Sequence, residues 1–292
     1  MANREKITFQ WLGAAHYHIL YKNCRIILDP LYTRLPGDFP HLELTANTIN
    51  WIDCLLLTHA HLDHSHDFPN LLSTFDAKAY APDRYLSDLK NKKIYPDYTF
   101  DVSKCHSLEK IKGHMFKANE IEITPFQIGT EQIDFWFIRS MFIRPWRHKK
   151  PQAIPYGLKW LGHYLFCNCF AYHFHFPSIE KSMLYFGNLT DQVDELDIVD
   201  RVHILAIPYC PANNKWLKQS QFLINRFKPD VTLVHHFDNF MHPYTLAKYL
   251  DLNHYQKAIS EKCPNARLLF SKFCKSIEID DILNHKTSRS PL

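Results

Sequence analysis

The sequence predicts an α/β fold, because buried strands alternate with segments of helical periodicity along the chain. Cys54-Leu55-Leu56-Leu57 has the length and apolarity of a buried strand, and a helix is expected to begin near Phe68. Residues 216–227 show helical periodicity and lead to another buried strand at Val231–Val234. The chain has 292 residues, 46% of them apolar, which is enough for a large core.

Alternation and turn residues predict the other elements. A first strand over Ile7–Gly13 precedes a hairpin that ends at Asp29-Pro30, and a loop follows over residues 31–50. Further predictions are a helix over Pro82–Asn91, strands at Ile121–Pro125, Phe170–Phe176, Met183–Gly187 and Val202–Pro208, a helix over Pro243–Lys262, and a last strand at Ala266–Phe270. We treat residues 1–284 as one domain and expect a flexible tail over residues 285–292.

The composition argues against several classes of protein. The formal net charge is only +4, which gives no strong sign of nucleic-acid binding. The first residues lack the apolar core of a signal peptide, and no apolar run reaches the length of a membrane span. Eight cysteines without a CxxC motif are typical of reduced thiols in a core, so we expect a cytoplasmic protein. The oligomeric state is not indicated.

The strongest functional signal is the segment THAHLDHSHD at residues 58–67, directly after the strand at 54–57. His59 and His61 are two residues apart, so in extended geometry both imidazoles project to one side. Asp63 and His64 follow as the chain turns and can face a second point nearby. Imidazole and carboxylate are ligands of Zn, Fe and Mn, so the segment predicts a site for two metal ions about 3.5–4 Å apart. A histidine-rich surface loop is the alternative, but it would need neither the strand nor this spacing.

The His-x-His-x-Asp-His pattern after a strand resembles the metallo-β-lactamase superfamily. The opening hairpin and Leu12-Gly13-Ala14-Ala15-His16 are similar to its lactonase-like branch, which includes ascorbate-6-phosphate lactonases and the phospholipase D that cleaves N-acyl-phosphatidylethanolamine. The resemblance runs from about Ile7 to about Phe273. It implies an αββα sandwich of two mixed sheets with helices outside and the metal site at one edge.

The resemblance also implies a ligand set. His59 and His61 would hold one metal, and Asp63, His64 and His236 would hold the other. Zinc is expected at both positions, with Fe or Mn as alternatives, and Asp63 would also orient the attacking water.

Two further assignments depend on the chain around these ligands. His236 follows the strand at 231–234 and precedes an aromatic residue, so it matches the last metal histidine better than His235 does. Asp29 would lie behind the ligands and orient one of them, although a turn-capping role before Pro30 is equally compatible.

Two positions depart from the superfamily pattern. A third histidine is expected after the strand at 121–125, where this chain reads FQIGTE from Phe126 to Glu131. Glu131 could supply a carboxylate, or His163 could reach the site, and surface placement is the alternative for each. A bridging aspartate is expected after Gly187, where this chain has Asn188, with Asp191 three residues on. An amide bridges two cations less well than a carboxylate, so one ion could bind weakly or not at all.

A basic, aromatic insertion is predicted over about residues 139–165. Residues 135–179 contain no Asp or Glu, and Arg144 and Arg147 are interleaved with aromatic side chains. We expect this segment to bind a small anionic substrate, with a membrane surface or nucleic acid as other anionic partners. A solvated basic loop is the alternative.

The leading functional hypothesis is a metal-dependent hydrolase acting on an anionic ester, lactone or phosphodiester, phosphorylated or phospholipid-like. The second is a diiron oxygen-using enzyme on the same fold, for which Glu131 would be a suitable ligand. The third is a binding protein that retains only part of a metal site.

Overall fold

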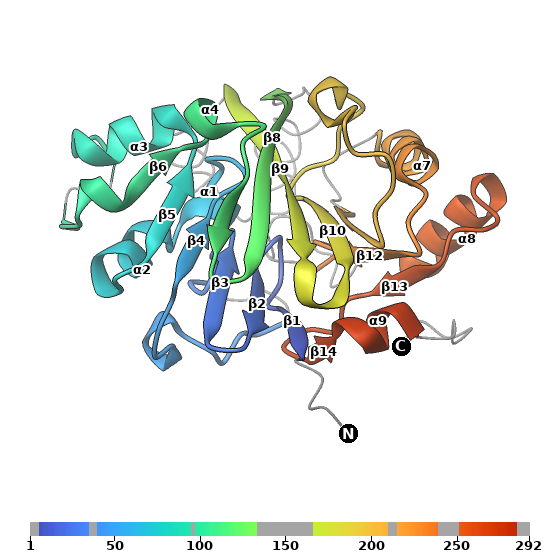
Figure 1. Ribbon diagram of the computed structural model, residues 1–292, viewed down its shortest axis with the longest axis horizontal. Helices are drawn as coiled ribbons and strands as arrows, with labels where there is room; N and C mark the ends of the chain where they lie inside the picture. The colour runs from blue at the N-terminus through green and yellow to red at the C-terminus, as the bar shows by residue number, and fades with distance from the viewer. Residues whose placement is uncertain are drawn as a thin grey trace, which may run out of the picture.

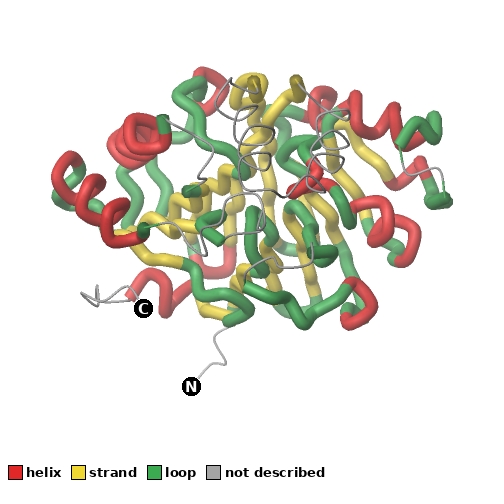
Figure 2. Tube along the Cα trace, turned by 180° about the vertical axis from the view of Figure 1, so that it is seen from behind, coloured by secondary structure: helices red, strands yellow, loops and turns green. Residues whose placement is uncertain are grey.

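Two mixed β-sheets pack face to face at the centre of the protein, and helices cover both outer faces (Figure 1). The computed structural model describes residues 6–34, 40–94, 97–132, 166–209, 215–238 and 251–284. The view from behind shows the same layers, with strands inside and helices on both flanks (Figure 2). None of the helices in these ranges is long and apolar enough to cross a bilayer.

The first sheet has the strand order β14-β1-β2-β3-β4-β5-β6. Its first four strands pair antiparallel, and β3 to β6 pair parallel. The strands are β1 (Ile7–Trp11), β2 (Tyr17–Tyr21), β3 (Cys24–Leu28), β4 (Cys54–Leu56), β5 (Lys78–Ala81), β6 (Cys105–Ser107) and β14 (Ser276–Glu278). The helices between them are α1 (Leu62–Ser65), α2 (Phe68–Thr74), α3 (Asp83–Lys90) and α4 (Leu108–Ile111).

The second sheet has the order β13-β12-β11-β10-β9-β8-β7. Strands β7 to β10 pair antiparallel, and β10 to β13 pair parallel. The strands are β7 (Phe116–Ala118), β8 (Ile121–Gln132), β9 (Phe166–Phe176), β10 (Lys181–Phe186), β11 (Ile204–Pro208), β12 (Val231–His235) and β13 (Leu268–Phe270). Helices α7 (Trp216–Phe227) and α8 (Leu252–Lys262) belong to this half, whereas α9 (Ile279–Asn284) follows β14 and contacts the first sheet. Short 3₁₀ turns lie at Ala46–Thr48 and Val102–Lys104 in the first half of the chain and at Pro177–Ile179 and Asp194–Leu196 in the second.

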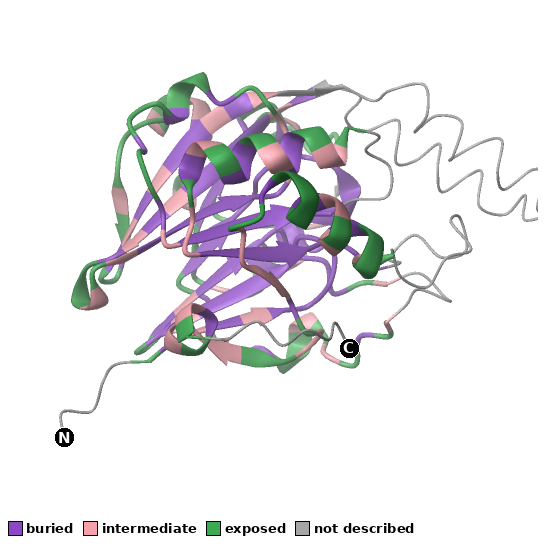
Figure 3. Cartoon of the chain, turned by 90° about the vertical axis from the view of Figure 1, so that its right-hand side faces the viewer, coloured by how far each residue is buried: buried purple, intermediate pink, exposed green. Residues whose placement is uncertain are grey.

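Aromatic and aliphatic side chains fill the space between the sheets. Most residues of the central strands are buried (Figure 3). Phe9 of β1 meets Phe176 of β9 edge-to-face, with 6.1 Å between ring centroids. A second buried cluster joins the outer face of the first sheet to α2 and α3, where Phe68 packs edge-to-face on Tyr85. Burial of apolar area on both sides of each sheet stabilises the layered arrangement.

The predicted α/β sandwich is confirmed, and several element boundaries need correction. The helix at 216–227 and the strands around the histidine segment are found as expected. Strand β8 extends to Gln132 instead of ending at Pro125, because a register shift between Gln127 and Thr130 lets pairing continue past Gly129, whose φ is +95°. The segment Ala266–Phe270 is not the last strand, since β14 follows and pairs with β1.

Other predicted segments lie partly or wholly outside the described residues. Helix α8 begins at Leu252, and residues 243–250 of the predicted Pro243–Lys262 helix are not described. The same holds for the insertion at 139–165 and the tail at 285–292.

Hydrogen bonds join the two sheets beside the histidine segment. Phe170 N of β9 donates to Thr58 O at 2.9 Å, and Tyr172 Oη donates to Leu57 O at 2.9 Å. These bonds satisfy carbonyl groups that the end of β4 leaves unpaired. They therefore fix the position of β9 against the chain just before His59.

Candidate metal centre

The histidine segment changes from extended to helical backbone at His61. His61 has φ −63° and ψ 149° and is the N-cap of α1, whose four residues include Asp63 and His64. His59 and His61 thus lie on the extended part, and Asp63 and His64 lie in the first helical turn. All four side chains are buried, as a site that excludes bulk water requires.

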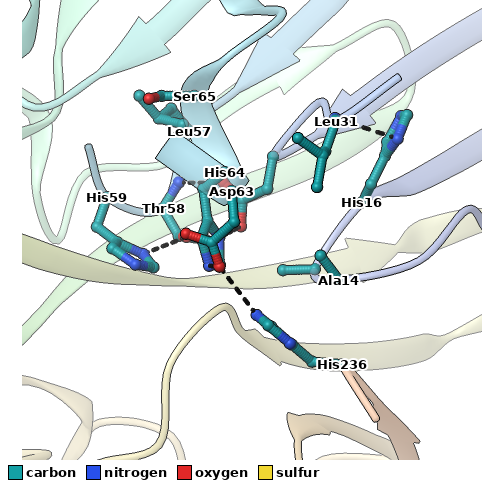
Figure 4. Close-up of polar contacts among 12 residues, drawn as sticks. Ala14, His16, Leu31, Leu57, Thr58, His59, Asp63, His64, Ser65 and His236 are labelled. Carbon is teal, nitrogen blue, oxygen red and sulfur yellow. Dashed lines mark hydrogen bonds and ion pairs between the residues drawn. The ribbon is translucent and has the colours of Figure 1, made fainter. Parts of the chain in front are cut away.

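Three potential ligands converge from two distant parts of the chain (Figure 4). Asp63 Oδ2 lies 3.4 Å from His64 Nε2 and 3.4 Å from His236 Nε2. The three donor atoms lie within 4.8 Å of one another. The fold therefore brings the residue after β12 to the residues after β4, which their sequence separation alone does not require.

His59 and His61 lie beside this group. The His59 ring is 3.9 Å from the His64 ring and 4.8 Å from the His61 ring, measured between centroids. Thr58 Oγ1 is 3.0 Å from His59 Nδ1, which orients the ring. The five predicted ligands His59, His61, Asp63, His64 and His236 are therefore neighbours in the structure.

Asp29 organises the segment from behind. Its carboxylate accepts hydrogen bonds from Thr58 N and Thr58 Oγ1, both at 2.7 Å, and lies 2.9 Å from His64 Nδ1. Asp29 is fully buried, and the His64 contact leaves Nε2 directed toward Asp63 and His236. A carboxylate that holds the far nitrogen of an imidazole fixes its tautomer and raises its basicity as a ligand.

The opposing charges in this group shift two pKa values. Burial opposes ionisation of Asp63, but His64 and His236 keep the pKa of this carboxyl well below its usual range. Burial also favours a neutral His64, but Asp63 and Asp29 raise its pKa to about 10. Without a metal, the carboxylates thus stabilise a proton at the point where a cation would bind.

The loop that carries His236 is held by a second set of polar contacts. His236 has φ +59°, a left-handed conformation that costs energy in a non-glycine residue. Asp238, two residues on, accepts from Ala14 N at 2.8 Å and pairs with Arg34 at 3.0 Å, and both side chains are buried. His235 instead lies in the core, with its ring stacked on Tyr185 at 5.2 Å.

Cys167 lies near the histidine segment. The sequence indicated only that the cysteines are core thiols. Cys167 lies at the start of β9 and is 5% exposed. It packs in the buried cluster that also contains Leu57 and Ala60. A hydrogen bond from Cys169, followed by the effects of the histidines of that segment, lowers the pKa of the Cys167 thiol. The local signal in the sequence is weak, since it is only the closely spaced pair Cys167-Asn168-Cys169.

The remaining predicted site residues are not part of the ligand group around Asp63, or lie outside the described residues. Asp191 is exposed, and its carboxylate lies 3.9 Å from Lys218 Nζ, while its role as a ligand stays a prediction. Asn188 is half-buried and follows Gly187, where an added Cβ would lie 2.2 Å from Thr58 Oγ1. Glu131 pairs with Cys167 in the β8–β9 ladder. His163, Arg144 and Arg147 lie outside the described residues.

A groove of about 500 Å³ on the second sheet is a separate feature. His173, His175 and His203 line it, together with Lys181 and Arg201. His175 Nδ1 contacts Glu122 at 2.9 Å, and Ser182 N donates to His203 Nδ1 at 3.1 Å. Its lining includes none of the predicted ligands, so the buried group around Asp63 is the better candidate centre.

Comparison with known proteins agrees with this geometry. Residues 24–140 match the family described as the β-lactamase superfamily domain. Igni18, a metallo hydrolase from the archaeon Ignicoccus hospitalis, superposes with a TM-score of 0.62 at 14% identity, covering 94% of this chain and 98% of that one. The protein has the metallo-β-lactamase fold.

Other proteins that this chain resembles are named for different activities. A segment of 92 residues is 34% identical to a UPF0173 metal-dependent hydrolase of Polynucleobacter asymbioticus and spans 31% of this chain and 32% of that relative. CmlA, a diiron β-hydroxylase from Streptomyces venezuelae, superposes with a TM-score of 0.57 at 13% identity, covering 94% of this chain and 54% of that one. The resemblance to the lactonase-like branch remains a prediction.

The residues present fit a divalent metal ion. Asp63 Oδ1 is buried and accepts no hydrogen bond from the residues that the structure describes. Its second oxygen and two imidazole nitrogens converge within ligand-forming range of a common point. A buried carboxylate between two imidazoles is the donor set that zinc, iron and manganese share.

The Asp29→Asn substitution tests the support behind His64. The amide nitrogen cannot accept the hydrogen bond from His64 Nδ1, so the ring loses its orientation. We expect metal affinity to fall about 10- to 100-fold, measured by competition with a chromophoric chelator. Asp53→Asn is the control, because exposed Asp53 also accepts a backbone N–H, from Arg25 at 2.7 Å, but outside the site. Equal affinities for the two variants would contradict the role of Asp29.

Metal binding should release a proton from His64. Because its pKa is raised to about 10, the ring is protonated at neutral pH in the metal-free protein and must lose that proton to become a ligand. Affinity should therefore rise by up to about tenfold per unit between pH 7 and 9. Calorimetry in buffers of different ionisation enthalpy measures the released protons directly. A flat affinity with no proton release would show that His64 is already neutral.

Proposed function

We propose that the protein is a metal-dependent hydrolase. The observation that carries the proposal is the convergence of Asp63, His64 and His236 from separate sheets, with His59 and His61 beside them. Such a buried group is costly to maintain unless a cation compensates its polar atoms. The fold and the relative named as a metal-dependent hydrolase add support.

The side chains of the centre have separable tasks. Bound divalent ions would supply acidity to a water molecule and polarise the bond to be cleaved. His64 is held by Asp29 so that Nε2 faces the site. Asp63 stays ionised, with Oδ2 toward both imidazoles, which leaves Oδ1 to accept a hydrogen bond from the attacking water and orient it.

The substrate we propose is a small anionic ester, lactone or phosphodiester. The support comes from the sequence, where Arg144 and Arg147 lie in a stretch without acidic residues. Uncompensated positive charge raises the local concentration of anions, and arginine binds phosphate through two parallel hydrogen bonds. A phospholipid surface offers the same phosphate chemistry and is the alternative partner.

Two measurements together test the function: the metal content of the purified protein and its hydrolytic turnover. We expect close to two equivalents of zinc or manganese in the purified protein and hydrolysis of bis(p-nitrophenyl) phosphate or a simple lactone. His61→Ala and His236→Ala should each lose bound metal and activity. His114→Ala is the control, because His114 is exposed and lies elsewhere.

Two results would contradict the hydrolase. Bound iron with a visible absorption band and no hydrolysis would favour the oxygen-using enzyme. Sub-stoichiometric metal with no turnover of any substrate would favour a binding protein.

Charge reversal tests the anionic substrate separately. Arg144→Glu combined with Arg147→Glu should raise KM for an anionic substrate about tenfold or more and reduce its dependence on salt. Metal content should not change. The control is Lys92→Glu with Lys93→Glu, which makes the same change in net charge on an exposed turn. If both double variants have the KM of the unmodified protein, the basic segment does not contact the substrate.

A further inference from the structure

The groove on the second sheet lies on the outer face of that sheet, away from the metal centre. Met183 and Tyr185 of β10 face the first sheet, where they line the same small void as Phe9. Because side chains alternate along a strand, Ser182 faces outward, toward the groove that it lines. Ser182 comes five residues before Gly187, which borders the ligand segment, so about 17 Å of extended chain separates them. The groove is therefore a distinct place in the molecule.

Polar side chains of three adjacent strands form a row across this outer face (Figure 1). Glu122 of β8 is opposite His175 of β9, which is opposite Ser182 of β10. The Glu122 carboxylate lies 2.9 Å from His175 Nδ1. His203, directly before β11, continues the row, because its Nδ1 accepts from Ser182 N at 3.1 Å. Two of the imidazoles that line the groove are thus held in fixed orientations.

His203 offers a hydrogen-bond donor to a ligand in the groove. Since the backbone N–H of Ser182 donates to Nδ1, that nitrogen carries no proton, and the proton of the neutral ring is on Nε2. Burial lowers the pKa of His203, which favours the neutral ring. No residue in the described part of the chain bonds to Nε2, so its N–H can donate to a bound molecule.

Two cationic side chains line the same groove. Half-buried Lys181 has no acidic partner within the described ranges, and Arg201 contacts Asp230 through one of its nitrogens and keeps its other N–H donors. Asp200 and Glu180 also line the groove, but both are exposed, where solvent and salt screen their charge. An ammonium, a guanidinium and an imidazole N–H together suit the oxygens of a phosphate group.

An apolar wall adjoins these donors. Ile198 is 75% exposed, more than any other large apolar side chain that the structure describes. Ile198 and Val199 line the groove together with Phe126 of β8. A ligand with an apolar part next to its phosphate would cover Ile198 and remove it from water. The volume of about 500 Å³ is within the range of small-molecule sites.

We propose that this groove binds a small organic phosphate. The phosphate lies against Lys181, Arg201 and His203 Nε2, and the apolar part of the ligand packs on Ile198. The two cations supply the attraction, and the imidazole N–H fixes the orientation of the phosphate. The site is additional to the metal centre and does not depend on the proposed hydrolysis.

Binding of phenylphosphonate tests the site, because this anion resembles an organic phosphate but has no ester bond that the metal centre could cleave. Titration calorimetry of the full chain should show a binding event that His236→Ala retains, since that variant changes only the metal centre. Lys181→Gln should weaken the event about tenfold or more, because a charged donor is lost. Asp200→Asn should strengthen it about twofold, because a repelling charge is removed. Methylphosphonate should bind about fivefold more weakly, since it cannot cover Ile198.

Two substitutions of His203 separate ligand binding from packing. Asparagine can accept from Ser182 N but has no donor at the position of Nε2, so His203→Asn should weaken binding about tenfold. Glutamine carries an amide N–H close to that position, so His203→Gln should bind more tightly than His203→Asn. Lys257→Gln is the control, because it removes the same charge from an exposed position on α8 and should leave the affinity unchanged.

The outcomes decide between the groove and other places for the anion. Weakening in Lys181→Gln and His203→Asn, with Lys257→Gln unchanged, would support the groove. Equal affinities in all of these variants would overturn it, and loss of the event in His236→Ala would place the anion at the metal centre instead. Sedimentation with vesicles of phosphatidic acid, without binding of phenylphosphonate, would overturn the small ligand in favour of a lipid headgroup.

Discussion

The buried carboxylate of Asp29 is the interaction on which the rest of the centre depends. It stands at the end of β3 with φ +45° and binds both the backbone and the hydroxyl of Thr58 as well as His64. A buried charge persists only if hydrogen bonds compensate its desolvation, and here each of those bonds also positions the ligand segment. Gly187 allows β10 to approach this group, because any larger side chain would collide with Thr58 and Asp29. The two sheets can therefore meet at the site only with this glycine.

Local sequence patterns predicted those parts of the centre that one short segment supplies. The strand at 54–56 and the turn into α1 follow from apolar clustering and from the spacing of His59, His61 and Asp63. His236 is different, because its strand could be predicted from local sequence, but its pairing with Asp63 required the family resemblance. Cys167 comes near the histidine segment because β9 pairs with β8 and bonds to Thr58. A contact set by sheet register over such a separation leaves no local periodicity to detect.

Tertiary contacts also changed the use of residues whose position was predicted correctly. Asp67 is the N-cap of α2, which begins at Phe68 near the predicted start, but its side chain caps no helical N–H. Its two oxygens instead accept from Tyr32 N, Thr33 N and Thr33 Oγ1, all within 2.8 Å. Asp67 thereby anchors the chain that leaves Pro30. The helix start could be predicted from the sequence but the partners of Asp67 could not, because the nearby loop supplies its hydrogen-bond donors.

The origin of the ligands in both sheets also matters for the stability of the fold. Asp63 and His64 follow β4 in one sheet, and His236 follows β12 in the other. An ion bound between them is a reversible cross-link between the two halves of the sandwich, and it stabilises the folded state only as far as it is occupied. At a free concentration one hundred times its Kd, such an ion adds about 2.7 kcal/mol to the free energy of unfolding. Resistance to unfolding and proteolysis would then follow the metal supply of the surroundings, and starvation for metal would mark the protein for turnover.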